Sequence, residues 1–183
     1  MMIKNNQYKA ELALLSNTLI WGATFVLIKT ALNDSSPMAF VAVRFAISTL
    51  VLFILFRKYL KNISRKSLIQ GFWLGVVLYL GFIFQTIGLS TTTATKSAFI
   101  TGTFVVFTPI FQIITEKRAP TKKNVISIVL VFIGISLLSS KGDSVFDVFI
   151  ELGANFTFGD FLTLLCAILF AWYIVYLNIS KKR

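Results

Sequence analysis

The chain has 183 residues, of which 56% are hydrophobic and 14% charged, and its formal net charge is +11. Average soluble domains carry about a quarter charged residues, so this composition excludes an ordinary soluble domain and favours the lipid bilayer as solvent. The basic residues fall between apolar runs and not along one helix face, which argues against nucleic acid as a partner. There is one cysteine, Cys166, and no histidine. An intrachain disulfide, a His-based zinc site and a Ser-His-Asp triad are therefore excluded, and we expect no metal and no cofactor.

Six apolar runs predict six transmembrane helices. A bilayer core requires about 20 apolar residues per helix, and lipid offers backbone polar groups no partner outside the helix itself. The first run is too long for a signal peptide and no cleavage site follows it, so we expect it to be retained. The fifth run is short and is expected to stand upright in the membrane. The predicted fold class is all-α, a polytopic transmembrane helix bundle with these spans: Leu12–Leu32, Pro37–Phe56, Leu68–Ser90, Ser97–Thr115, Asn124–Ser140 and Asp160–Ile179.

The loops predict the orientation of the bundle. Fourteen of the 18 basic residues lie on the side that also holds both termini, whereas the other side holds most of the acids. The positive-inside rule therefore predicts that both termini are cytoplasmic. The basic residues on that side are Lys4, Lys9, Arg57, Lys58, Lys61, Arg65, Lys66, Lys117, Arg118, Lys122, Lys123, Lys181, Lys182 and Arg183.

Two basic residues fall inside predicted spans, where ionisable groups are functional candidates. Lys29 lies close to the end of its helix, so its side chain is expected to snorkel to the outer surface. Arg44 lies seven residues into the second span, roughly 10 Å deep at 1.5 Å per residue. Two interpretations of Arg44 remain open: it holds an anionic group of a ligand, or it ties down carbonyls of a neighbouring helix. No carboxylate lies at mid-depth, so the chain shows no obvious proton-carrying acid.

Polar and aromatic side chains at membrane depth are the candidate site residues. They are expected to line a substrate cavity, with interhelical hydrogen bonding as the alternative for any single hydroxyl. Trp21 and Thr24 belong to the first span, Gln85 to the third, and Ser97 and Thr101 to the fourth. Together with Arg44 they make six cavity candidates.

Three further sequence features concern packing and symmetry. The Gly71–Gly75 segment has the small-xxx-small pattern that predicts close helix contact, and Pro109 is expected to interrupt the fourth helix. Residues 11–29 and 160–178 are alike at an offset of 149: both open with an acid, and both reach a bulky aromatic before a small residue, Trp21-Gly22 and Phe170-Ala171. Five helices separate their starts, so the two segments point in opposite directions, as in the inverted repeats of secondary transporters.

These residues, in their order and spacing, resemble the EamA type of the drug/metabolite transporter superfamily over nearly the whole chain. The resemblance is carried by Trp21-Gly22, Lys29, Pro37, Arg44, Gln85-Thr86-Ile87-Gly88-Leu89, Thr92-Thr93-Ala94, Ser97-Ala98-Phe99-Ile100, Pro109, Glu116, Gly134, Gly159-Asp160-Phe161-Leu162 and the run from Phe170 to Val175.

The resemblance implies two inverted five-helix repeats around a central cavity in the inner membrane. Residues 1–140 would be the first repeat, 141–158 an extracytoplasmic loop, and 159–183 the start of a second repeat that lacks four helices. It implies a transporter that moves small metabolites by alternating access, in efflux or exchange. If the chain is truncated, the resemblance implies that it is inactive alone. A homodimer, or a chain carrying the missing repeat, would then be the partner.

Two other functions are alternatives to the transporter. One is a non-transporting membrane subunit or scaffold with a sealed interior. The other is an intramembrane enzyme, which the Gly159-Asp160 pair faintly suggests. That chemistry requires two acids close enough to share a proton, and no second acid lies inside a neighbouring span. We therefore expect that the chain is not an enzyme.

Overall fold

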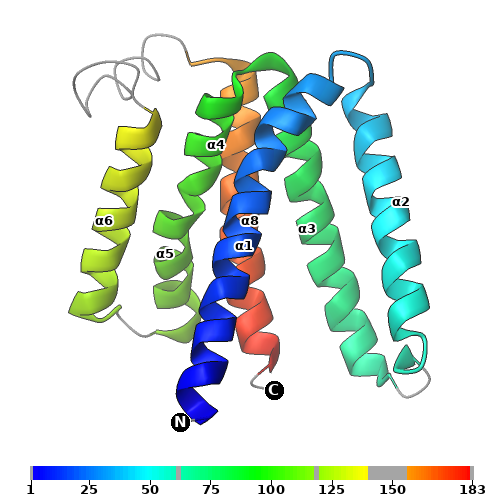
Figure 1. The fold of residues 1–183 in the computed structure, drawn as a ribbon, viewed down its shortest axis with the longest axis vertical. Helices are drawn as coiled ribbons and strands as arrows, with labels where there is room; N and C mark the ends of the chain where they lie inside the picture. The colour runs from blue at the N-terminus through cyan, green and yellow to red at the C-terminus, as the bar shows by residue number, and fades with distance from the viewer. Residues whose placement is uncertain (1, 61–62, 118–119, 140–155, 182–183) are drawn as a thin grey trace.

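The computed structural model describes residues 2–60, 63–117, 120–139 and 156–181. Every regular element of these residues is a helix, and the bundle is shown in Figure 1. The helices are α1 (Met2–Ala31), α2 (Pro37–Phe56), α3 (Arg65–Thr91), α4 (Ala94–Gly102), α5 (Phe104–Glu116), α6 (Lys122–Ser139) and α8 (Phe158–Lys181).

The predicted spans agree with the helices that the structure contains. Five segments are long and apolar enough to cross a membrane, with α4 and α5 counted together as Ala94–Glu116, and α6 holds a shorter apolar stretch, Asn124–Gly134. The predicted fold class, an all-α polytopic bundle, is confirmed. The first span is the least accurate, because α1 continues toward the N-terminus as far as Met2. Glu11, which we expected to open that helix, therefore lies inside it, where it accepts a hydrogen bond from Gln7.

The fourth span is interrupted, but not where its proline predicts. Pro109 lies inside α5, whereas the break falls at Thr103, between α4 and α5. The amide of Thr103 donates to Ile100 O at 3.1 Å, and the Thr103 carbonyl accepts from the amides of Val106 and Phe107. The break thus involves a single residue at which the α-helical bonding pattern is tightened, and the two segments continue as one membrane crossing.

The helices begin and end at two opposite ends of the bundle. The N- and C-termini lie at one end, here called the terminal end, and the opposite end is called the far end (Figure 1). The far end holds the connections between α1 and α2 and between α3 and α4, together with the start of α8. Both termini lie at the same end, as an even number of crossings requires.

Helix α8 occupies the centre of the bundle. It packs most extensively against α3 and also against α5 and α4, whereas α2 packs on α3 and α6 on α4 and α5 (Figure 1). Several of its residues are completely buried, among them Cys166, Ala167 and Ala171. The buried side chains of Phe99 and Ile100 in α4 also pack against a residue of α8, Leu164. The helix that we predicted to open a second repeat therefore packs among the helices that we predicted to form the first.

Glycines allow α3 and α8 to come close together. A Cβ atom added to Gly88 would lie 2.5 Å from Thr163 Oγ1 and 2.6 Å from the carbonyl oxygen of Gly159. A Cβ on Gly159 would in turn meet Thr91 Oγ1 and would lie 2.7 Å from the carbonyl oxygen of Gly88. The two backbones are in contact, so neither position has room for a side chain.

The glycines that we expected to make a close contact do not make one among the described residues. A Cβ on Gly71 or on Gly75 would meet nothing within 4 Å. For the part of the chain that the structure describes, the prediction from the small-xxx-small pattern is therefore wrong, because that face of α3 points away from the bundle. The predicted loop 141–158 lies almost wholly outside the described residues, so the proposed domain boundary stays a prediction.

Candidate functional site

A buried polar trio connects α3 with α4. Gln85 is 3% exposed, Thr101 1% and Ser97 0%. Gln85 Nε2 donates a hydrogen bond to Thr101 Oγ1 at 3.3 Å, and Ser97 lies one helical turn from Thr101. The Ser97 hydroxyl has no hydrogen-bond partner among the described residues. A buried hydroxyl without a partner is rare in native structures and commonly marks the position of a water or a ligand. The structure thus brings three of the six predicted residues together.

An aromatic row crosses the bundle about one turn closer to the terminal end. The Phe82 ring packs edge-on against Phe170, with their centroids 5.2 Å apart, and Phe170 lies 6.4 Å from the ring of Trp21. Trp21 in turn contacts Phe104, with centroids 5.9 Å apart. The row therefore takes one side chain from each of α3, α8, α1 and α5. Tilted and edge-to-face contacts at these distances are the favoured geometries of aromatic pairs.

Arg44 lies at one end of this row. Its guanidinium carbon lies 4.4 Å from the centroid of the Phe82 ring, which is a cation–π contact. Among the described residues it forms no ion pair, and the bonds to carbonyls of a neighbouring helix that one interpretation predicted are absent. The side chain is half-buried. Its planar fork of donors is thus held against an aromatic face, an arrangement that suits a carboxylate or phosphate.

Thr24 is the sixth predicted residue. Its hydroxyl donates to the carbonyl oxygen of Trp21, one turn earlier in α1, at 2.5 Å. That bond satisfies the hydroxyl within its own helix, and the side chain is half-buried. Among the described residues Thr24 makes no hydrogen bond to the polar trio, so its role in a cavity stays a prediction.

A network that sequence reasoning missed ties α8 to α4 and α3 at the far end. Lys96 Nζ lies 2.7 Å from Asp160 Oδ2, and Thr92 Oγ1 donates to Asp160 Oδ1 at 2.7 Å. Thr157 donates to the same carboxylate through its amide, at 2.8 Å, and through its hydroxyl, at 2.9 Å. Asp160 is fully buried, so this satisfied set of partners replaces the water that the carboxylate loses.

Part of that network has a sequence signal. Asp160 N donates back to Thr157 Oγ1 at 3.2 Å, so the two residues form a reciprocal capping box at the start of α8. A threonine three residues before an acid and ahead of an apolar run is the signature of such a box. The partner Lys96 has no local signal, because it lies 64 positions earlier in the chain.

Lys29 also acts at the far end. Its ammonium donates to the carbonyl oxygens of Leu89 and Ser90, at 2.8 and 2.9 Å. These carbonyls belong to the last turn of α3, where the helix dipole favours a cation. The side chain extends toward the far end of the bundle as expected, and its ammonium there binds the end of a neighbouring helix.

A groove lies between α5, α6 and α8. Its volume is about 360 Å³, and its wall includes Phe104, the last member of the aromatic row. Several polar side chains line it as well. The lining residues are Phe104, Val105, Thr108, Pro109, Gln112, Pro120, Asn124, Ser127, Ile128 and Ile174. Since Pro120 precedes α6 and Asn124 lies in its first turn, the groove extends from the terminal end of the bundle to the aromatic row.

Comparison with known proteins identifies related transporters. The model of the EamA-like transporter family matches residues 8–140. An uncharacterized transporter of Archaeoglobus fulgidus is 39% identical over 161 residues, which cover 88% of this chain and 46% of that protein. The uncharacterized transporter YyaM of Bacillus subtilis is 32% identical over 133 residues, which cover 70% of this chain and 44% of that protein.

A third relative has a named substrate. The S-adenosylmethionine/S-adenosylhomocysteine transporter of Chlamydia muridarum is 30% identical over 135 residues, which cover 70% of this chain and 42% of that protein. The chain spans about half the length of the curated relatives it matches. No solved structure matches the chain with significance.

Proposed function

This chain belongs to the EamA-like transporter family, and from that premise we propose that it carries small metabolites across the cell membrane by alternating access. It is a multi-pass membrane protein. The charge bias of its loops supports an orientation with both termini in the cytoplasm. The terminal end would then face the cytoplasm and the far end the outside.

The observation that carries this proposal is the order of layers along the bundle. At the far end, Lys96, Asp160 and Lys29 bind α1, α3, α4 and α8 together. Below them lie the polar trio and the aromatic row, and the groove of about 360 Å³ leads from the row toward the terminal end. A site near mid-depth with one closed and one open approach is what alternating access requires of a single state.

The chemistry of the layers supports a substrate class. Arg44 offers a cation beside an aromatic face, and the trio offers hydrogen-bonding groups that include the unpartnered Ser97 hydroxyl. We propose a metabolite that combines an anionic group with an apolar or planar body. S-adenosylmethionine, which one relative is named for, carries a carboxylate and a planar base and is therefore a suitable first probe.

Because the matched relatives are about twice as long as the chain, we propose that transport requires further helices to complete the cavity wall. They would come from a longer form of the chain, from a partner chain or from a second copy. A same-orientation second copy cannot by itself rebuild an inverted pair, since the charge bias fixes the orientation of each copy.

Cysteine accessibility tests the cavity without knowledge of the substrate. The native Thr101 side chain is 1% exposed. In the variant Thr101→Cys, an impermeant maleimide should therefore label the cysteine only when a water-filled path opens. We expect labelling from one membrane face in cells, and reduced labelling when a bound metabolite is present. Ile47→Cys on the outside of α2, 58% exposed at the native residue, is the lipid-facing control and should stay unlabelled. If Thr101→Cys is as unreactive as that control from both faces, the interior is sealed and the scaffold function replaces transport.

A further inference from the structure

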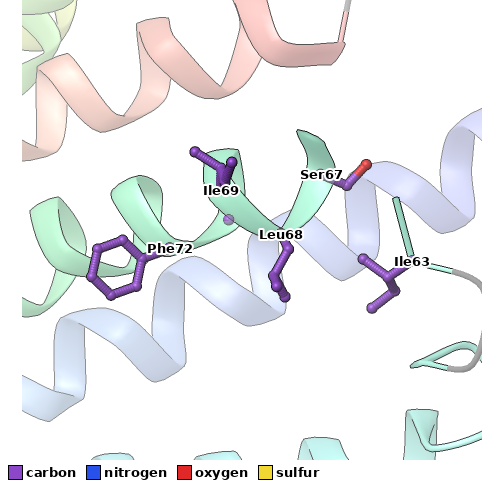
Figure 2. A pocket seen from close by; sticks show the side chains of 6 residues that line it. Ile63, Ser67, Leu68, Ile69 and Phe72 are labelled. Carbon is purple, nitrogen blue, oxygen red and sulfur yellow. The ribbon is translucent and has the colours of Figure 1, made fainter. Parts of the chain in front are cut away.

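A second groove runs along the outer surface of α3 at the terminal end. Its volume is about 660 Å³, and the residues that line it are Ile63, Ser67, Leu68, Ile69, Gly71 and Phe72. Figure 2 shows Ile63, Leu68 and Phe72 along one side of the segment. The four large apolar side chains of the lining are between 45% and 65% exposed. Apolar side chains on the outer face of a membrane-spanning helix face lipid, and here they border a groove.

Glycine gives the groove its depth. A Cβ on Gly71 would meet nothing within 4 Å, and the same is true one turn further along α3 at Gly75. The backbone of α3 is therefore accessible along this face between the larger side chains of Leu68 and Phe72. A slender aliphatic chain fits such a trough, whereas the native side chains of the bundle leave it unfilled.

Positive charge surrounds the terminal end of the groove. Arg65 and Lys66 lie in the chain between two lining residues, Ile63 and Ser67, while Arg57 and Lys58 follow the end of α2. All four basic side chains are exposed. The sequence holds no Asp or Glu between Asp34 and Glu116. Within the described residues none of the four basic groups is in a salt bridge. No carboxylate of α2 or α3 neutralises this cluster.

We propose that the groove binds an anionic phospholipid of the cytoplasmic leaflet. One acyl chain lies over Leu68, Gly71 and Phe72, and the headgroup phosphate is held by Arg65 and Lys66, with Arg57 and Lys58 adding to the local potential. Basic clusters at the cytoplasmic ends of membrane helices attract anionic headgroups by about 1 kcal/mol per Lys or Arg, which corresponds to roughly fivefold in affinity for each residue. The groove adds a fixed position for the chain to this general attraction.

Charge argues for lipid over a second copy of this chain. The positive-inside rule gives two copies the same orientation. A symmetric pairing over this face would place the unneutralised clusters of both copies at the same depth, where like charges repel. An anionic headgroup removes that repulsion, so the lipid is the occupant that complements both the apolar groove and its basic end.

Native mass spectrometry of the purified full chain tests the site. The probes are palmitoyl-oleoyl phosphatidylglycerol and its zwitterionic phosphatidylcholine counterpart, added at equal concentration. We expect phosphatidylglycerol to be retained in preference. Arg65→Gln combined with Lys66→Gln should weaken it about 30-fold, from roughly fivefold per charge. Lys117→Gln combined with Lys122→Gln removes the same charge at the same end of the bundle, away from the groove, and should leave retention unchanged.

A second pair of variants tests the acyl chain. Gly71→Leu fills the groove without a clash and should reduce retention at least fivefold, while Gly134→Leu, at an equally open position in α6, should have no effect. Equal retention of the two lipids would overturn the proposal, as would equal losses in the two charge variants, which would indicate general surface attraction. Glycerol 3-phosphate that competes as well as phosphatidylglycerol at the same concentration, or retention unaffected by Gly71→Leu, would also overturn it, because either result shows that the acyl chain adds nothing to binding.

Discussion

Trp21 and Phe170 contact each other, with their ring centroids 6.4 Å apart. These two residues are 149 positions apart, which is the offset that aligns the first helix with the last described one. In an inverted repeat, equivalent residues meet only where they lie close to the symmetry axis. The contact is consistent with the prediction that α1 and α8 are corresponding helices of two repeats, which itself stays a prediction.

This pair should be energetically coupled. Trp21→Ala and Phe170→Ala each remove packing, but an aromatic pair contributes about 0.5–1.5 kcal/mol beyond its buried area. We expect a double-mutant cycle on the free energy of unfolding, measured in mixed micelles, to show coupling of that size. Trp73→Ala with Phe170→Ala is the control, since the Trp73 side chain is exposed, and should be additive. Strict additivity for Trp21 and Phe170 would contradict the contact.

Removal of only one partner of the Lys96–Asp160 pair should strongly lower the free energy of unfolding. Asp160→Asn keeps most of the shape but leaves the ammonium without its carboxylate, and removal of one partner of a buried pair costs about 3–5 kcal/mol. The double variant Lys96→Met with Asp160→Leu should recover a large part of that loss. Unfolding free energies of the single and double variants in the same detergent provide the measurement.

High salt should distinguish the buried Lys96–Asp160 pair from charges at the surface. A buried pair is screened much less than an exposed one, so the effect of Asp160→Asn should persist in 1 M salt. Lys122→Gln, at an exposed position, is the matched control and should change stability by less than about 0.5 kcal/mol. A loss for Asp160→Asn that disappears at high salt would mean that the carboxylate is solvated.

The glycines of α3 should differ sharply in their tolerance of alanine. Gly88→Ala places a methyl group 2.6 Å from the carbonyl oxygen of Gly159, and overpacking of this kind costs about 1–3 kcal/mol. Gly75→Ala meets open space and replaces the poorer helix former, so it should be neutral or stabilise the helix by up to about 1 kcal/mol. Thermal unfolding of the two variants decides this, and similar midpoints would refute the close approach of α3 and α8.

Ser97 and Thr101 should differ in how much stability the protein loses when their hydroxyls are removed. Ser97 Oγ has no partner, and an unsatisfied buried polar group costs about 1–3 kcal/mol, so Ser97→Ala should not destabilise the free protein. Thr101→Val removes the acceptor of Gln85 Nε2 and should cost about 1–3 kcal/mol. Unfolding free energies check both. A clear loss for Ser97→Ala would show that a water or ligand already satisfies that hydroxyl.

Arg44 tests the proposed substrate class. Arg44→Met keeps the length of the side chain but removes the charge. If the carboxylate of S-adenosylmethionine pairs with the guanidinium, loss of one partner of the pair costs about 2–5 kcal/mol. We then expect uptake of labelled S-adenosylmethionine by membrane vesicles to fall at least about 30-fold. Arg44→Lys retains a cation but not the planar fork and should retain part of the uptake. Unchanged uptake in Arg44→Met at equal expression would exclude this role.

Hydropathy and charge in the sequence determined which segments cross the membrane and that both termini share one side. Both follow from the bilayer itself, which demands long apolar helices and biases basic loops to one face. The acid Asp160 also marked the start of the last helix, where the helix dipole favours an anion. Gln85 and Thr101 were identified as polar residues at membrane depth for the same reason.

Only the tertiary structure decided which faces of these helices meet. Lipid is as apolar as leucine, so an apolar residue in a span carries no sign of whether it faces protein or bilayer. For this reason the pattern at Gly71 and Gly75 predicted a contact that α3 makes instead at Gly88. The pairing of Lys96 with Asp160, and of Lys29 with the carbonyls that end α3, joins residues more than 50 positions apart. Such pairings depend on the packing of whole helices, which no local pattern encodes.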